Sequence, residues 1–169
     1  METNLSPSAK RVQQAIQERG FHCNILELVS STRTAQEAAD AAGCELRQIV
    51  KSLVFTATQT GEPILALVSG ANRVDENLLA KAVGQLVVKA TGEFVREHTG
   101  FAIGGVPPLG HAHPLMTFID ADLMELPLLW AAAGTPHAIF SITPTDLVEM
   151  TGGTIIKITG AGQSVKSEP

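Results

Sequence analysis

The chain has 169 residues, of which 44% are hydrophobic and 17% charged, and its formal net charge is −5. These values predict one globular domain with a sizeable core and argue against a broad nucleic-acid surface, which would need clustered Lys and Arg. No window approaches about 18 consecutive apolar residues and no secretory leader pattern opens the chain, so we expect no membrane span and no export. Cys23 and Cys44 are isolated, as is typical of reduced cytoplasmic thiols.

The first elements are predicted to be a helix and a strand. Ser6 can cap a helix over residues 6–19, Pro7 occupies its first helical position, and Gly20 can end it. A short apolar run predicts a strand over residues 24–29.

A capping box marks the start of the next helix. The Thr34 hydroxyl can accept a hydrogen bond from the backbone N–H of Glu37, and the Glu37 carboxylate can accept one from the N–H of Thr34. We expect this helix to run through an alanine-rich face to Gly43.

Strands and helices then alternate without regular βαβ repeats. Strands are predicted over residues 49–55, 64–68, 85–88, 115–119, 128–130, 138–142 and 154–158. Helices are predicted over residues 75–83, 91–98 and 143–150, with Asp75 as a cap and Pro144 at a first helical position. The order predicts a single mixed α/β domain over residues 1–159 with a curved central sheet flanked by helices. The small, polar stretch at residues 160–169 is predicted to be a disordered tail.

The segment from Gly100 to His111 holds four glycines, two adjacent prolines and a histidine between two apolar stretches. Glycine permits positive φ and close approach of a ligand, whereas proline fixes φ and removes a donor. One interpretation is a shaped loop that presents backbone groups to a ligand; the other is a tight turn between core strands.

Lys51 interrupts an apolar strand. Period-2 alternation places it on one face with Ile49, Leu53 and Phe55, which makes a poor solvent face and a better pocket wall. A lysine in that setting can hold a phosphate or carboxylate. The alternative is an edge position that points to water.

Two histidines are further candidates. His111 can serve as a pocket wall or hydrogen-bonding group, and His137 is a similar candidate, unless it packs and bonds locally. A metal site at His111 and His113 is disfavoured, because no Cys, Asp or Glu lies nearby at ligand spacing.

Motifs for covalent or cofactor chemistry are missing from the sequence. It contains no nucleophile elbow, no Walker or Rossmann glycine pattern, and no cysteine in a basic or helix-start setting. Asp120 and Asp122 look like caps of a helical turn more than a catalytic pair. We therefore expect no cofactor and no metal.

Three features occur in a characteristic order: the Thr34-x-x-Glu37-Ala38 helix, Lys51 on the next strand, and a Gly-x-x-x-Pro loop at residues 104–108 followed by Leu-Gly-His. This set resembles the YbaK family of editing domains associated with prolyl-tRNA synthetase. The stretches at residues 118–120 and 130–140 resemble its free-standing members, and the resemblance covers residues 6 to about 158.

The resemblance implies a barrel-like sheet and hydrolysis of the ester that joins a wrong amino acid to tRNA, typically tRNA for proline. It implies attack by water assisted by a ribose hydroxyl, with N–H groups of Gly105, Val106 and Leu109 orienting the carbonyl. The catalytic residues it implies are Lys51, Gly104, Gly105, Val106, Pro107 and Pro108. The substrate-binding residues it implies are Thr34, Leu109, Gly110, His111 and His137.

One stretch departs from the family pattern. Deacylases of the family that act on cysteinyl-tRNA carry Ser-Gly-x-Arg-Gly and a later Asp, whereas this chain has small and apolar groups at residues 132–137 and Ile139 at the place of that Asp. The change predicts a small aliphatic amino acid such as alanine or 2-aminobutyrate, with relaxed specificity.

The implied partner is mischarged tRNA, with prolyl-tRNA synthetase or translation factors as further candidates, and neither DNA nor a membrane. Four basic residues can supply a local patch, unless they are solvated helix charges: Arg73, Lys81, Lys89 and Arg96. The rival hypothesis is a non-enzymatic module that binds an aminoacyl-adenosine or a free amino acid. The sequence leaves the oligomeric state open.

Overall fold

The computed structural model describes residues 5–160, so residues 161–169 of the predicted tail lie outside the described part. The helices are α1 (Pro7–Glu18), α2 (Ala35–Ala42), α3 (Glu76–Val83), α4 (Gly92–Thr99) and α5 (Pro144–Thr151), with short 3-10 turns η1 (Leu46–Gln48) and η2 (Ala121–Glu125). The strands are β1 (Ile25–Glu27), β2 (Ile49–Ala57), β3 (Pro63–Ser69), β4 (Val87–Lys89), β5 (Met116–Asp120), β6 (Leu129–Ala132), β7 (Ala138–Ile142) and β8 (Thr154–Ile156).

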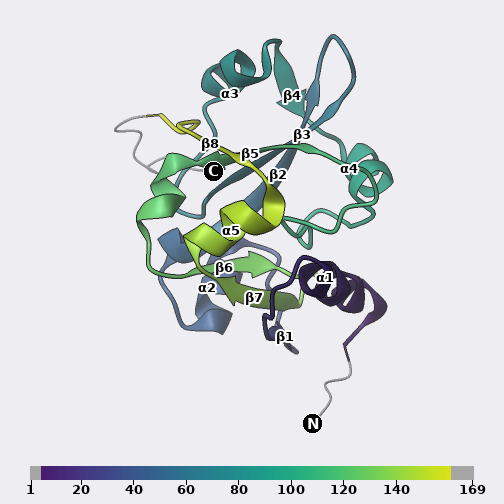
Figure 1. The fold of residues 1–169 in the computed structure, drawn as a ribbon, viewed down its shortest axis with the longest axis vertical. Coiled ribbons are helices and arrows are strands. Elements are labelled where there is room, and N and C mark those ends of the chain that lie inside the picture. Colours follow the sequence, from purple (N-terminus) through teal and green to yellow (C-terminus); the bar gives the residue numbers. More distant parts are fainter. Residues whose placement is uncertain (1–4, 161–169) are drawn as a thin grey trace.

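The eight strands form one mixed sheet in the order β1-β7-β6-β2-β3-β5-β8, and β4 pairs with β2 as a side branch. The pairs β2–β6, β3–β5 and β5–β8 are parallel, and the other pairs are antiparallel. Figure 1 shows β6 and β7 at one end and β3, β5 and β8 at the other, with the long β2 joining them. The predicted mixed α/β domain with flanking helices is confirmed.

Helix starts follow the capping residues that the sequence predicts. The Ser6 side chain accepts from the N–H of Ala9, and the Asp75 side chain accepts at the start of α3. The Thr34 hydroxyl accepts from the N–H of Glu37 at 3.1 Å, and Glu37 Oε1 accepts from the N–H of Thr34 at 3.3 Å, so the predicted capping box is formed.

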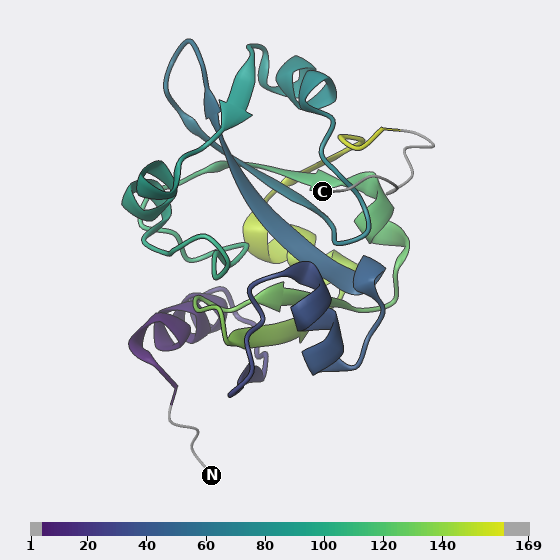
Figure 2. The same ribbon diagram turned by 180° about the vertical axis from the view of Figure 1, so that it is seen from behind.

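Helices pack against both faces of the sheet. The main core gathers α1, α5 and one face of β2 and β3 around buried side chains such as Ile16, Leu65 and Phe140. A second cluster under α3 is built around Phe55 and Leu79. Figure 2 shows α2 from behind, where it covers the β6–β7 end.

Several boundaries differ from the prediction. The strand predicted over residues 85–88 is β4, which starts at Val87, and Gln85 lies before it, where its side chain accepts from the N–H groups of Gln59 and Thr60 in the β2–β3 turn. The strand predicted over residues 24–29 is shortened to β1, and Leu28 then bonds to the His137 carbonyl. In the described residues 5–160, the helices are all too short or too polar to cross a membrane.

Candidate active site

A cavity of about 760 Å³ lies beside β2. Its walls come from β2, the start of α2, the segments that follow β3 and β4, the end of β6, and the loop that follows α4. These segments are far apart in the sequence, and they come together beside β2, which contributes the longest continuous stretch of the wall.

The cavity lies at a gap in the sheet. Along one edge of β2, β6 pairs only with Ile49 and Val50, and β4 pairs only from Phe55 onward. Next to β4, the N–H of Ala90 donates to the Val54 carbonyl on this edge, whereas the Ile49 carbonyl accepts on the opposite edge, beside β3. Main-chain groups of alternate residues in a strand point to the same edge, so the N–H and C=O of Ser52 point into the gap.

Lys51 is half-buried in the cavity wall. Its Nζ donates to the main-chain carbonyl of Asn72 at 2.5 Å. Leu53 and Phe55, which share its face, pack into the cluster under α3, as the period-2 pattern predicts. Because the sheet is open at this point, Lys51 from one face and Val106 from the other line the same cavity.

Two buried hydroxyl oxygens in the cavity wall, Thr32 Oγ1 and Ser52 Oγ, have no hydrogen-bond partner. A buried hydroxyl without a partner costs free energy, so such groups are where a ligand gains most from pairing. Sequence reasoning missed both residues. The signal for Ser52 was a second polar side chain, directly after Lys51, in an otherwise apolar strand.

The first half of the glycine-proline loop borders the cavity, and Gly104 and Val106 line it. Gly104 has φ of +95°, and a Cβ on it would lie 2.7 Å from Cγ of Arg33. A Cβ on Gly105 would lie 2.8 Å from the carbonyl carbon of Thr135. The loop is therefore wedged between two other segments, which favours the shaped-loop interpretation over a simple turn.

The N–H of Gly105 donates to the Ala102 carbonyl at 3.0 Å, so it closes a turn within the loop. This contact corrects the expectation that Gly105 offers a donor to a substrate carbonyl. The structure points to Ser52 as the residue whose main-chain N–H faces the cavity.

The second half of the loop packs behind the cavity. Pro107, Pro108 and Leu109 are buried and are not among the cavity-lining residues, and Gly110 lies against Ala15 of α1. Their predicted part in catalysis or binding stays a prediction. In the structure these residues pack the loop against the core behind the cavity.

His111 braces this half of the loop. Its Nε2 lies 2.7 Å from the Pro107 carbonyl, which requires a proton on Nε2 because a carbonyl only accepts. Burial lowers the pKa of His111 to about 4 against the opposing effect of that bond, so the ring is neutral at pH 7. It lies outside the cavity lining.

Thr34 and His137 lie on neighbouring segments. Thr34 lines the cavity while its hydroxyl caps α2. His137 is exposed and is not a lining residue; its Nδ1 lies 3.2 Å from the Ser30 carbonyl, the local bonding that the sequence left open. Binding of substrate by His137 stays a prediction.

Positive charge prevails around the cavity, in a chain whose net charge is −5. The basic residues in the lining are Arg33, Lys51, Arg73 and Lys89, and the acidic residues are Asp75 and Glu76. Of the basic residues in the predicted patch, Arg73 and Lys89 line the cavity and Lys81 and Arg96 do not.

The cysteines are poor nucleophiles. Burial raises the pKa of both Cys23 and Cys44, which disfavours the reactive thiolate. Within residues 5–160, no three His, Cys, Asp or Glu side chains are grouped so that they could hold a metal ion. The polar groups that the cavity offers are its charged side chains, the hydroxyls of Thr32 and Ser52, and main-chain groups.

The chain is similar in sequence and in structure to several known proteins. The family described as "Aminoacyl-tRNA editing domain" matches residues 29–150. A solved structure described as a "putative trans-editing enzyme for prolyl tRNA synthetase" superposes with a TM-score of 0.88 at 52% identity, over 94% of this chain and 100% of that chain.

Two curated relatives have names that state a reaction. The "Putative Cys-tRNA(Pro)/Cys-tRNA(Cys) deacylase EbsC" of Enterococcus faecalis is 27% identical over 75% of this chain and 77% of the relative. The "Proline--tRNA ligase" of Limosilactobacillus fermentum is 32% identical over 55% of this chain, which corresponds to 17% of the ligase. The similarity thus extends both to a free-standing protein and to a small part of a synthetase.

Proposed function

The chain belongs to the aminoacyl-tRNA editing domain family and is an aminoacyl-tRNA deacylase that edits in trans; we propose that its substrate is tRNA for proline carrying a small amino acid such as alanine or 2-aminobutyrate. The observation that carries the proposal is the cavity at the gap in the sheet beside β2, which Lys51, Ser52, Gly104 and Val106 line together. Hydrolysis by an attacking water needs such positioned groups and no protein nucleophile.

The main-chain N–H and C=O of Ser52 are suited to bind two polar groups of an aminoacyl ester, its carbonyl oxygen and its α-ammonium group. Its N–H can donate to the ester carbonyl oxygen and stabilise the charge that develops there, and its C=O can accept from the α-ammonium group. One donor of this kind is worth about 3 kcal/mol in other enzymes. Water attacks the ester carbon, the C–O bond to the ribose breaks, and the proton that the attacking water loses passes to the departing ribose oxygen.

The lining supports a small aliphatic amino acid. The part of the wall contributed by β6 and β7 consists of Trp130, Ala131, Ala132 and Ile139, and the indole N–H of Trp130 is the one polar side-chain group among these four. A volume of about 760 Å³ is larger than such an amino acid needs, which leaves room for the terminal adenosine.

The basic lining residues support binding of the phosphates of the tRNA end. Arg33, Lys51 and Lys89 are the inferred contacts, since all three line the cavity and both arginine and lysine bind phosphate. A tRNA substrate places the proposed activity in the cytoplasm, with prolyl-tRNA synthetase or a translation factor as the candidate supplier of mischarged tRNA.

The test is deacylation of a panel of mischarged tRNAs by the purified protein. We expect release of alanine or 2-aminobutyrate from tRNA for proline well above the rate in buffer, and little release of proline. A protein that binds an aminoacyl-adenosine analogue but releases no amino acid from any member of the panel would instead be the binding module.

A further inference from the structure

Lys51 is held by the turn that follows β3. The Asn72 carbonyl that accepts from Lys51 Nζ belongs to a tight turn in which the N–H of Asn72 donates to the Ser69 carbonyl at 3.0 Å. Ser69 is buried, and its hydroxyl donates to the Arg47 carbonyl at 2.8 Å. One end of the turn is therefore anchored to the segment before β2.

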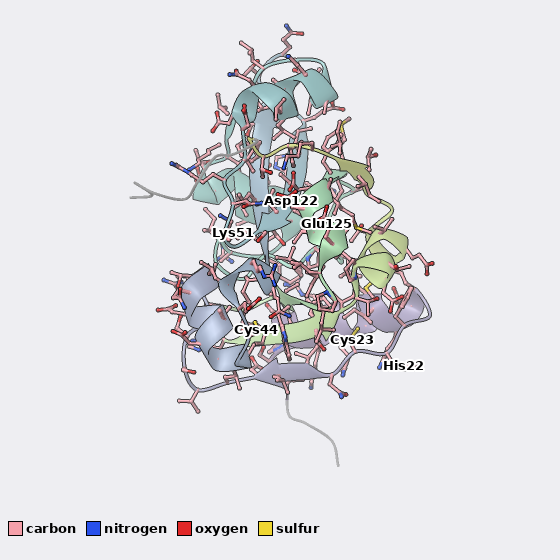
Figure 3. The ribbon with its side chains drawn as sticks, turned by 90° about the vertical axis from the view of Figure 1, so that its left-hand side faces the viewer. His22, Cys23, Cys44, Lys51, Asp122 and Glu125 are labelled. Carbon is pink, nitrogen blue, oxygen red and sulfur yellow. The ribbon has the colours of Figure 1, made fainter. Side chains whose placement is uncertain are left out.

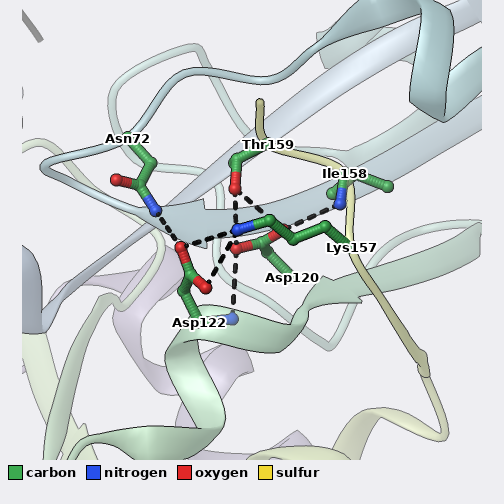
Figure 4. Close-up of polar contacts among 6 residues, drawn as sticks. All are labelled: Asn72, Asp120, Asp122, Lys157, Ile158 and Thr159. Carbon is green, nitrogen blue, oxygen red and sulfur yellow. Dashed lines mark hydrogen bonds and ion pairs between the residues drawn. The ribbon is translucent and has the colours of Figure 1, made fainter. Parts of the chain in front are cut away.

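The Asn72 side chain anchors the other end of the turn. Its Nδ2 donates to Oδ2 of Asp122 at 2.8 Å, and Lys157 Nζ lies 3.1 Å from both oxygens of the same carboxylate (Figure 4). Figure 3 shows Lys51 and Asp122 on the same side of the molecule. Asn72 thus links the cavity lysine to a carboxylate that does not line the cavity.

Asp122 is fixed in turn by Asp120, a carboxylate with 0% exposure at the end of β5. Asp120 accepts from the N–H of Asp122 at 3.2 Å, from the N–H of Ile158 at 2.8 Å and from the Thr159 hydroxyl. These bonds fasten the start of η2 to the chain that follows β8. Asp122 therefore projects from a rigid base toward Asn72.

We propose that Asn72 and Asp122 are positioning residues for Lys51, an inference that rests on the proposed function. A lysine has a long, flexible stem and three rotatable donors, so its ammonium needs a fixed acceptor if it is to meet one point on a substrate. The Asn72 carbonyl is that acceptor, and the Asn72–Asp122 hydrogen bond keeps the carbonyl in place. Lys157 shares the carboxylate without contacting Asn72, so it is not required for this role.

The experiment measures kcat/KM for the mischarged tRNA and the thermal melting of each variant. Asn72→Ala and Asp122→Ala both remove the anchoring bond, and we expect each to lower kcat/KM about 10-fold, less than the roughly 100-fold that a 1 Å misplacement of a catalytic group can cost. Asp122→Asn keeps an acceptor for Asn72 Nδ2, so its kcat/KM should lie close to that of the wild type and well above that of Asp122→Ala. Lys157→Met is the matched control and should leave kcat/KM unchanged.

A double-mutant comparison separates positioning from general structural support. In a Lys51→Ala background, Asn72→Ala should produce no further loss, because a residue that acts through Lys51 has nothing left to position. A further 10-fold loss in that background, or wild-type kcat/KM in Asn72→Ala, overturns the inference.

A second measurement does not depend on activity. In ¹⁵N spectra, the Lys51 ammonium signal, assigned by its loss in Lys51→Ala, should be protected from exchange in the wild type and in Lys157→Met. In Asn72→Ala, the Lys51 ammonium signal should lose this protection, because its protons then exchange rapidly with water. Equal protection in Asn72→Ala overturns the inference, whereas a wild-type protein inactive on every mischarged tRNA overturns the proposed function instead.

Discussion

At the scale of single residues, Lys51 carries the charge that the proposed reaction uses. Replacing it with Ala removes a charge-assisted contact worth about 1.5–3 kcal/mol, so we expect kcat/KM for mischarged tRNA to fall about 10- to 100-fold. Lys81→Ala, on α3 and outside the cavity lining, is the control for loss of a positive charge. An unchanged rate in Lys51→Ala would remove this residue from the mechanism.

His111 makes stability depend on pH. Its pKa is lowered to about 4 in the folded protein, whereas an unfolded histidine titrates near 6.5, so protons bind preferentially to the unfolded chain between these values. The contribution is fully present above about pH 6.5 and is lost as the pH falls toward 4. For this one group, we expect the free energy of unfolding to fall by about 2 kcal/mol between pH 7 and pH 5.

His111→Gln is the matched variant for this prediction. A glutamine amide can reach the Pro107 carbonyl in place of Nε2, but it does not titrate. Urea unfolding at pH 7 and pH 5 should therefore show a smaller difference for His111→Gln than for the wild type. The same difference in both proteins would mean that His111 is not the titrating group.

At the scale of elements, the glycine-proline loop is wedged against the segment after β6. A Cβ on Gly105 would lie 2.8 Å from the Thr135 main chain, closer than packed atoms tolerate, so Gly105→Ala must displace one of the two segments. We expect a loss of about 1–3 kcal/mol in the free energy of unfolding, measured in urea, and a lower deacylation rate.

Gly92→Ala gives the matched control for the loop. Gly92 lies at the start of α4, and a Cβ there would approach only the Ile103 side chain, at 3.8 Å. We expect this variant to unfold at the same urea concentration as the wild type or at a slightly higher one. Equal stability of Gly105→Ala and Gly92→Ala would contradict the wedged loop.

At the scale of the whole molecule, a chain of net charge −5 presents a cavity with more basic than acidic lining residues. Binding of phosphates by Arg33, Lys51 and Lys89 should release counterions, so log kcat/KM should fall with log salt with a slope of about −2. A matched aminoacyl-adenosine without phosphates should show a much flatter dependence. Equal slopes for both substrates would mean that these residues do not bind the tRNA backbone.

The sequence alone determined the local structure and predicted several residues that line the cavity, among them Thr34, Lys51, Gly104 and Val106. Ser6, the Thr34 capping box and Asp75 fix helix starts through bonds within a few residues, so their prediction needed no tertiary contact. Lys51 was placed on a pocket wall because period-2 alternation is a property of the strand itself. Capping bonds and strand alternation both depend on residues close together in the sequence, so predictions based on them hold in the folded protein.

Only the tertiary structure decided which of the predicted residues line one cavity and which further groups lie beside them. The gap that exposes Ser52 exists because β6 and β4 leave β2 at different points, and strand pairing joins residues distant in the sequence. The same distant contacts divide the loop, so that Gly104 faces the cavity while Pro107 is buried and held by His111. Spacing cannot distinguish these cases, because a residue's surroundings depend on segments that fold back against it.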